Sequence, residues 1–222
     1  MKHKKLILSI ILLLGLTLMR LQAQTSTVTD YDGNVYKTVT ISKQIWIVEN
    51  LKTTHYNDGE IIPLVEDSTA WSDQNSPGYC WYKNNQSTYG NIYGALYKWY
   101  TVETGKICPS GWHVPTEADW TALIDFSGGE KVAASKLKET GKTHWTDTSP
   151  ETNNSTGFTA LPGGNRFSYG GFNFIGSHGA WWSAQENSLG NAWLHSMIYI
   201  GNDVYKVEYD KTSGVSVRCV KN

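Results

Sequence analysis

Beyond its first 23 residues, this sequence has no stretch in which basic residues are concentrated. Its 222 residues include 19 Lys and Arg against 20 Asp and Glu, and four of the basic residues lie within the first 23 positions. The remainder carries 15 basic and 20 acidic residues, a net charge of −5. A protein that binds nucleic acid needs clustered positive charge to neutralise phosphates. The composition therefore predicts no nucleic-acid partner.

The one long hydrophobic run covers the 13 residues from Leu6 to Leu18. It is shorter than the roughly 20 residues of a membrane-spanning helix. A lysine-rich segment precedes it and Ala23 follows it, which predicts a signal peptide over residues 1–23. We expect a protein exported to the periplasm, the cell surface or the medium, with no transmembrane anchor after cleavage and one domain over residues 24–222. A retained anchor helix is the alternative.

The motifs of several enzyme classes are missing. There is no Gly-x-Ser-x-Gly motif of a serine hydrolase, and the histidines are scattered singly instead of at the spacing of a zinc site. The Glu-Pro-Asn, Gln-Pro-Asp and Trp-Asn-Asp triplets of calcium-dependent sugar binding are also missing. The carboxylate pair of a glycosidase has no fixed spacing in sequence. We therefore expect no metal or cofactor and a protein that is not an enzyme, with a polysaccharide-active enzyme as an alternative.

Phenylalanine is scarce, whereas the two larger aromatic residues are abundant. The chain has five Phe but ten Trp and 13 Tyr. Trp and Tyr combine an apolar ring with one hydrogen-bonding atom, which suits both irregular cores and surfaces that bind sugars or peptides. We expect most of these rings in the core and a minority on a ligand-binding face.

Periodicity and turn signals place strands at both ends of the chain and helices in the middle. An Asp32-Gly33-Asn34 turn predicts a hairpin, and Thr116 followed by Asp119 predicts a capped helix start. Gly94, inside a helical pattern, is expected to mark a close packing contact. The expected helices cover 91–104, 116–128 and 130–140, and the later strands cover 158–161, 181–185, 192–200, 204–210 and 214–220. This order predicts an α+β fold.

Several segments between residues 44 and 220 resemble a known family. They are QIWIVENLKTTHYNDG, GYCWYKNN, YGALYKWYTV, CPSGWHVPTEADWTAL, GFTALPGGNR, WWSAQE and SVRCV. Together they resemble the Fibrobacter succinogenes major paralogous domain family of exported bacterial proteins. The resemblance implies a C-type-lectin-like fold, related to the formylglycine-generating-enzyme group, with two to three helices packed on a small twisted antiparallel sheet with long loops. It assigns no activity, because one fold carries many functions.

The three cysteines are Cys80, Cys108 and Cys219. In an oxidising compartment, three cysteines predict one disulfide and one remaining thiol. We predict that Cys108, between two expected helices, pairs with Cys219 on the last strand, and that Cys80 stays free and buried. A Cys80–Cys108 pair is the alternative, because connectivity does not follow from sequence.

The resemblance places a ligand-binding face on the loops 144–157 and 163–182 and on the adjoining strands. The second loop is rich in glycine and aromatic residues, which supply backbone freedom and stacking area. The residues that we expect to be exposed ligand contacts are Trp145, Arg166, Tyr169 and His195. The residues that we expect to form a small core beneath the loop are Phe172, Phe174 and Trp181.

These observations favour an exported, non-enzymatic binding or adhesion module that recognises a glycan or a surface protein through its aromatic loop face. Besides the polysaccharide-active enzyme, a structural component of a surface assembly is an alternative. Exposed sheet edges would then be the contact surface.

Overall fold

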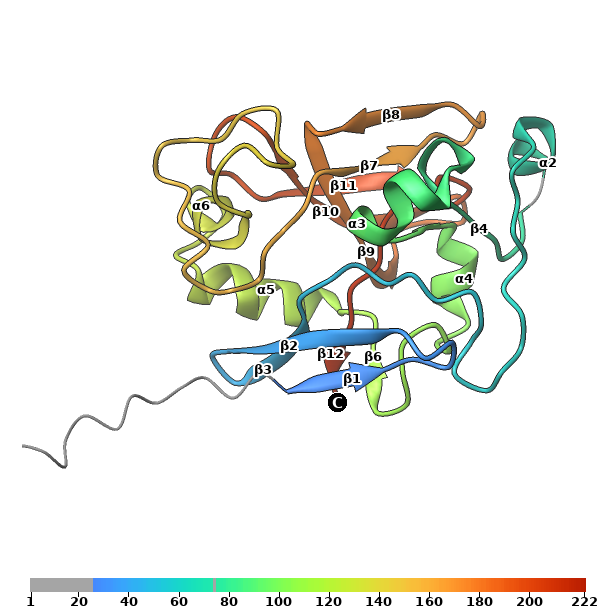
Figure 1. Cartoon of the computed structure of the whole chain (residues 1–222), viewed down its shortest axis with the longest axis horizontal. Helices are drawn as coiled ribbons and strands as arrows, with labels where there is room; N and C mark the ends of the chain where they lie inside the picture. The colour runs from blue at the N-terminus through green and yellow to red at the C-terminus, as the bar shows by residue number, and fades with distance from the viewer. Residues whose placement is uncertain (1–25, 74) are drawn as a thin grey trace, which may run out of the picture.

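The computed structural model describes residues 26–73 and 75–222 (Figure 1). They form several antiparallel sheets and a set of short helices, a mixed α+β fold in which strands predominate. The α+β prediction is therefore confirmed. The predicted signal peptide, residues 1–23, lies outside the described residues.

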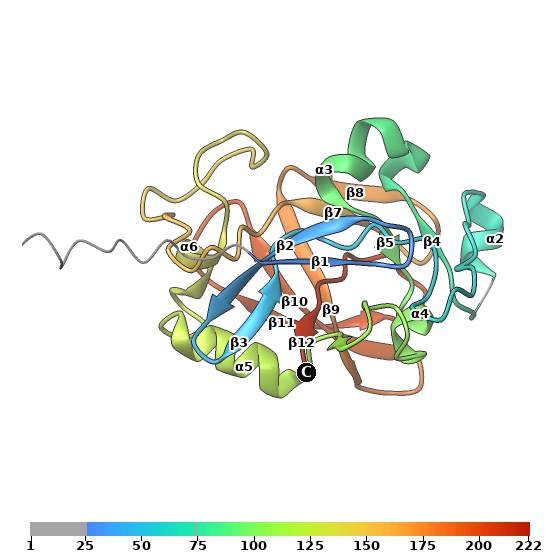
Figure 2. The same ribbon diagram turned by 60° about the horizontal axis from the view of Figure 1, so that its bottom comes forward.

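Strands from both ends of the chain build one sheet with the order β1-β2-β3-β12-β6. Its neighbouring strands are antiparallel. The β1–β2 hairpin turns at Gly33, whose φ of +81° favours glycine, as the sequence predicts. Figure 2 shows β12 beside β3, with the C-terminus at the end of β12. The bounds are β1 (Thr27–Thr29), β2 (Val35–Ile41), β3 (Gln44–Ile47), β6 (Trp112–His113) and β12 (Val220–Lys221).

A second, three-stranded sheet has the order β11-β10-β9, and two further sheets, β4–β5 and the β7–β8 hairpin, have two strands each. Side chains alternate between its two faces, so Leu194 and Ser196 line one hollow while His195 lines another. Figure 1 shows β8 on the opposite side of the molecule from β1. The bounds are β4 (Tyr79–Cys80), β5 (Leu96–Tyr97), β7 (Gly163–Arg166), β8 (Phe172–Ile175), β9 (His178–Glu186), β10 (Asn191–Ile198) and β11 (Tyr205–Asp210).

The longest helix among the described residues is α5, and it begins as the sequence predicts. The Thr116 hydroxyl accepts a hydrogen bond from Asp119 N (3.2 Å), and the Asp119 carboxylate accepts one from Thr116 N (2.9 Å). This capping box satisfies two amide groups at the helix start. The bounds are α2 (Ser68–Ser72), η1 (Tyr82–Asn84), η2 (Gln86–Gly90), α3 (Asn91–Tyr93), α4 (Trp99–Glu103), α5 (Glu117–Phe126) and α6 (Ala133–Leu137).

The prediction of a single helix over residues 91–104 is wrong. The chain forms α3, then β5, then α4, because Gly94 has a φ of +75° and ends the first helical turn. A Cβ at this position would lie 2.6 Å from the carbonyl oxygen of Leu51. The expected close approach at Gly94 is therefore confirmed, because the backbone leaves no room there for a side chain.

Three further elements differ from expectation. The strand expected at 214–220 makes only isolated bridges at Gly214, Val215 and Ser216 before β12 begins at Val220. The strand expected at 158–161 makes only an isolated bridge, between Lys138 and Ala160. Thr159 has a φ of +55°, and the Arg218 guanidinium takes the Phe158 and Thr159 carbonyl oxygens as acceptors. Those oxygens are therefore not paired with a neighbouring strand. The helix expected over 130–140 is shortened to α6.

Indole rings fill much of the interior. One cluster of contacting rings has neighbouring centroids 5.4 to 6.4 Å apart and consists of Trp46, Trp120, Phe158 and Trp181. The tryptophans with less than 2 % of their surface exposed are Trp46, Trp71, Trp120, Trp145, Trp181 and Trp182. The expectation that most large aromatic residues serve the core holds for these six.

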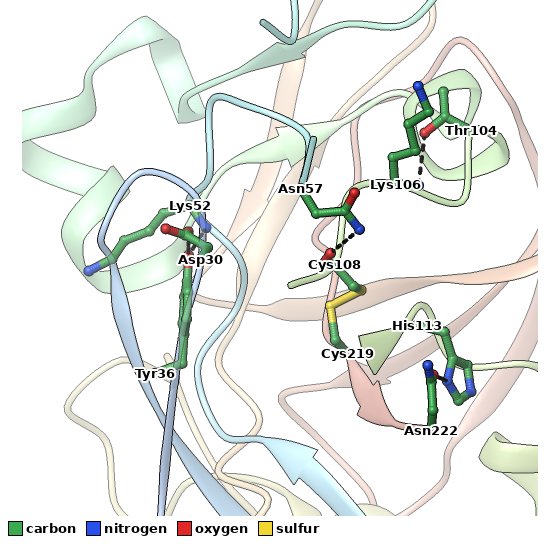
Figure 3. Close-up of a disulfide and its surroundings, with 10 residues drawn as sticks. All are labelled: Asp30, Tyr36, Lys52, Asn57, Thr104, Lys106, Cys108, His113, Cys219 and Asn222. Atoms are coloured by element: carbon green, nitrogen blue, oxygen red, sulfur yellow. Dashed lines mark hydrogen bonds between the residues drawn. A yellow bond between two sulfur atoms is a disulfide. The ribbon is translucent and has the colours of Figure 1, made fainter. Parts of the chain in front are cut away.

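The predicted disulfide is present and joins Cys108 to Cys219, which are 111 positions apart (Figure 3). It ties the segment before β6 to the segment before β12, so two adjacent strands of one sheet are also linked covalently. Asn57 Nδ2 donates a hydrogen bond to the Cys108 carbonyl oxygen (3.0 Å), which adds a third segment to the junction. Cys80 is free and buried, as predicted. The disulfide and the segments that it joins therefore have a structural role.

Candidate functional site

Four aromatic rings contact one another along the β7–β8 hairpin and the start of β9, in stacked, edge-to-face and tilted pairs. Phe167 and Tyr169 stack with centroids 5.2 Å apart and planes at 16°. Phe174 meets Phe167 edge-on at 5.8 Å and contacts His178 at 4.3 Å. Tyr169 is 68 % exposed and Phe174 is 37 % exposed. We call Phe167, Tyr169, Phe174 and His178 the aromatic shelf.

A buried arginine holds the loop that carries the shelf. Arg166 is 1 % exposed, and its guanidinium donates to the carbonyl oxygens of Gly170 (3.0 Å), Val65 (2.6 Å) and Glu66 (2.8 Å). The same group lies over the Trp71 ring at 4.3 Å. Charged hydrogen bonds of this kind are stronger than neutral ones. The turn that presents Tyr169 is therefore fixed from beneath.

Phe174 has an unusual backbone conformation. Its φ is +68°, a left-handed value that costs a non-glycine residue on the order of 1 kcal/mol. The conformation is held by Ser177, whose N and Oγ both donate to the Phe174 carbonyl oxygen at 3.0 Å. Backbone strain of this kind persists only where the surrounding structure enforces it, and strained residues are concentrated at functional sites. Here it accompanies a partly exposed ring that belongs to the shelf.

A cavity of about 190 Å³ adjoins the shelf, between the β7–β8 hairpin and the face of β9, β10 and β11 that carries Leu194. Phe174 and His178 belong to both the shelf and the cavity wall. The walls are mainly apolar, and no carboxylate, lysine, arginine or cysteine is among the described residues that line it. Its lining consists of Gly164, Asn165, Phe174, His178, Ala180, Leu194, Ser196, Val207, Tyr209 and Val215.

The polar groups of this cavity are uncharged at neutral pH. Asn165 Nδ2 donates a hydrogen bond to Tyr209 Oη (2.5 Å). Burial raises the pKa of Tyr209 to about 12 and lowers the pKa of His178 below its ordinary value of 6.5. The cavity is therefore suited to a neutral group that offers both apolar surface and hydrogen-bonding atoms.

A second hollow, of about 350 Å³, lies beside α5 and contains a charged network. Glu117 Oε1 is 3.3 Å from His195 Nε2, and Glu117 Oε2 is 2.8 Å from Lys206 Nζ. Burial alone would raise the pKa of Glu117, but hydrogen bonds from His195 and Lys206 outweigh it and bring the pKa to about 2. A carboxylate held ionised in this way does not serve as a general acid at neutral pH.

The structure separates the four residues that we expected to be exposed ligand contacts. Tyr169 is exposed and belongs to the shelf. The exposure expected for Trp145, Arg166 and His195 is wrong, since they are 1 %, 1 % and 4 % exposed. Trp145 Nε1 donates to Ala160 O (3.0 Å) inside the core, and His195 stacks on Trp120 at 4.6 Å. Each of these three side chains makes a buried contact with a residue that is distant in the sequence.

The small core expected of three aromatic residues is found in part. Phe172 packs against a small cluster that contains Trp71 and Cys80, as expected. Trp181 is fully buried but belongs to a larger cluster around Trp120. The prediction that Phe174 belongs to this core is wrong, because its ring is partly exposed on the shelf.

Sequence reasoning missed most of the cavity wall, including Asn165, His178 and Tyr209. A signal for it exists in β10 and β11, where alternation places Leu194 with Ser196, and Val207 with Tyr209, on one side. What the alternation does not show is that the β7–β8 hairpin folds over that side. The position of the β7–β8 hairpin is set by Arg166 and by contacts with residues that are distant in the sequence.

Two kinds of feature are absent from the described part of the chain. Residues 26–73 and 75–222 contain no group of three or more His, Cys, Asp and Glu side chains placed to hold a metal ion. In the same residues, no helix has both the length and the hydrophobicity needed to cross a membrane.

Comparison with known proteins identifies the family. The family model described as the Fibrobacter succinogenes major domain matches residues 39–221. This match covers most of the sequence, and the chain belongs to that family, as the resemblance of its motifs predicts. No curated protein and no solved structure matches the chain.

Proposed function

We propose that this family member is an exported, non-enzymatic binding module that holds a saccharide against the aromatic shelf. The observation that carries the proposal is the stack of the exposed Tyr169 ring on the half-buried Phe167 ring, beside an uncharged cavity. Flat aromatic rings offer an apolar surface to the C–H face of a sugar ring at little cost in side-chain entropy. The cavity supplies convergent polar groups within an apolar wall.

We propose further that the domain has a C-type-lectin-like fold. Three features support this proposal: strands from both chain ends share one sheet, a disulfide ties the last strand to the middle of the chain, and long loops carry the shelf. Export is supported by the disulfide, because such bonds persist in oxidising compartments.

Binding is favoured over hydrolysis by the chemistry of the cavity. A glycosidase places two carboxyl groups on either side of the bond that it cleaves. The described residues that line the cavity include no carboxyl group. Three acidic residues, Glu117, Asp125 and Glu130, line the other hollow, and there the carboxylate of Glu117 is held ionised by His195 and Lys206.

A glycan array tests the proposal, with the protein purified after export into the periplasm of a bacterial host. The test variant combines Phe167→Ala and Tyr169→Ala. The matched control is Tyr31→Ala, because Tyr31 is 61 % exposed but lies in the β1–β2 turn, away from the shelf. Thermal unfolding of all three proteins confirms that they are folded.

We expect the wild type and Tyr31→Ala to bind the same saccharides. Loss of one stacking ring weakens binding by about twofold to tenfold, so the double variant should fall below detection on an array. Equal binding by all three proteins would remove the shelf from the proposal. A folded wild type that binds no glycan would reject saccharide binding and favour a protein partner or an assembly role.

A further inference from the structure

The cavity beside the aromatic shelf has the size of a ligand substituent. Its volume is about 190 Å³, and a protein cavity of roughly 150 Å³ already accommodates benzene. An unsubstituted sugar bound on the shelf would bring only a hydroxyl group towards walls made by Ala180, Leu194 and Val207. A hydroxyl placed against such walls loses hydration without filling the space. A larger and partly apolar substituent fits better.

The hydrogen-bonding groups of the cavity further define that substituent. Tyr209 Oη accepts a hydrogen bond from Asn165 Nδ2, which leaves the tyrosine's own hydrogen to be donated to a carbonyl oxygen. The Ser196 hydroxyl lines the same cavity and can accept a hydrogen bond from an amide N–H. One acceptor, one donor and a small apolar group are together the features of an acetamido group.

The absence of charge from the described lining residues distinguishes the acetamido group from a free amine. The cavity wall has no carboxylate to pair with an ammonium group, and an unpaired charge is costly to bury. Burial also depresses the pKa of His178, so its ring stays neutral and brings no charge to the ligand at pH 7. A neutral substituent is therefore the one that matches.

We infer that the module recognises N-acetylhexosamine residues: the sugar ring stacks on Phe167 and Tyr169, and its acetamido group enters the cavity between the β7–β8 hairpin and the β9–β10–β11 sheet. The inference rests on the proposed function, because it requires the shelf to bind a saccharide. It adds that an N-acetyl group, instead of the sugar ring alone, supplies the selectivity.

Isothermal titration with three hexasaccharides tests the inference: chitohexaose, cellohexaose and the hexamer of glucosamine. They share β-1,4 linkages and differ in the substituent at C2. We expect chitohexaose to bind at least tenfold more tightly than cellohexaose at pH 7, and the glucosamine hexamer to bind most weakly.

Two variants probe the cavity itself. Ala180→Leu fills it, and Ser196→Ala removes one hydrogen-bonding group without adding atoms, so it remains informative if the first variant fails to fold. Ala184→Leu is the matched control, since Ala184 lies on the same strand but is exposed outside the cavity. We expect Ala180→Leu to bind chitohexaose and cellohexaose equally, Ser196→Ala to lose about threefold or more of the preference, and Ala184→Leu to keep it.

The outcomes separate the inference from the proposed function. Equal binding of chitohexaose and cellohexaose by the wild type would overturn the inference and leave saccharide binding intact. A preference for chitohexaose that both cavity variants retain would also overturn it. No binding of any hexasaccharide by folded wild type would overturn the inference together with the function on which it rests.

Discussion

The guanidinium carbon of Arg166 lies 4.3 Å from the ring centroid of Trp71, and both side chains are buried. The guanidinium has no carboxylate acceptor among its hydrogen bonds, which go to three backbone carbonyl oxygens, those of Val65, Glu66 and Gly170. The arginine therefore joins the segment before α2 to the loop that carries Tyr169. Sequence suggested a ligand contact at Arg166, whereas the structure makes it the support beneath the shelf.

Removal of this support should destabilise the fold. Arg166→Met leaves three carbonyl oxygens without their donors, and we expect a loss of about 3 kcal/mol in the free energy of unfolding. Urea denaturation followed by tryptophan fluorescence measures it. Lys43→Met, a change at an exposed position, should alter stability by no more than about 0.5 kcal/mol. An effect of Arg166→Met as small as that of the control would show that the arginine is dispensable.

The two kinds of cysteine should respond differently to reagents. Burial raises the pKa of Cys80 to about 12, so its thiol carries almost no thiolate at pH 8 and is closed to solvent. A thiol reagent should therefore label no cysteine in the folded protein and one cysteine per chain in denaturant. Rapid labelling of the native protein would show that Cys80 is accessible.

The disulfide should contribute strongly to stability. It closes a loop of 111 positions, and loop-closure entropy predicts on the order of 5 kcal/mol, whereas removal of a native disulfide typically costs about 2–5 kcal/mol. Cys108→Ser combined with Cys219→Ser should lower the urea midpoint accordingly. Added reductant should lower the midpoint of the wild type but not that of the double variant. A double variant with wild-type stability would assign the junction to non-covalent contacts such as Asn57 with the Cys108 carbonyl.

The charged network beside α5 predicts a loss of stability in acid. The pKa of Glu117 falls from its ordinary 4.5 to about 2 in the folded protein, so the unfolded chain binds more protons between these values. Its stabilisation is complete above pH 4.5 and is lost as the pH falls through this window towards 2. We expect about 2 kcal/mol, after allowance for solvent screening. Glu117→Gln should lose this share of the pH dependence, and the exposed-site control Glu103→Gln should retain all of it.

Local and long-range effects explain which features could be predicted. The α5 start depends on Thr116 and Asp119, three positions apart, and the sequence alone identified it. Gly94 signalled a close approach, but its neighbour is the Leu51 carbonyl, more than 40 positions away, and the left-handed φ that ends the helix was not predicted. Buried positions such as Arg166 and His195 read as exposed because their acceptors lie on distant segments. A polar side chain with a distant hydrogen-bond partner can be buried, so its polarity alone does not place it on the surface.

The left-handed backbone of Phe174 allows a comparison of two small substitutions at the shelf. At an ordinary position glycine is less stable than alanine by about 0.5–1 kcal/mol. At a φ of +68° the order should reverse, because the Cβ of alanine is strained there and glycine is not. We expect Phe174→Gly to be about 1 kcal/mol more stable than Phe174→Ala in urea denaturation, and both to bind chitohexaose about twofold to tenfold more weakly than the wild type. The same pair at Tyr169, which is not among the positive-φ residues, should keep the ordinary order.

If alanine is the more stable at both positions, the strain at Phe174 is refuted. If the Phe174 variants bind normally, the ring is not part of the binding surface, and its conformation serves the hairpin alone.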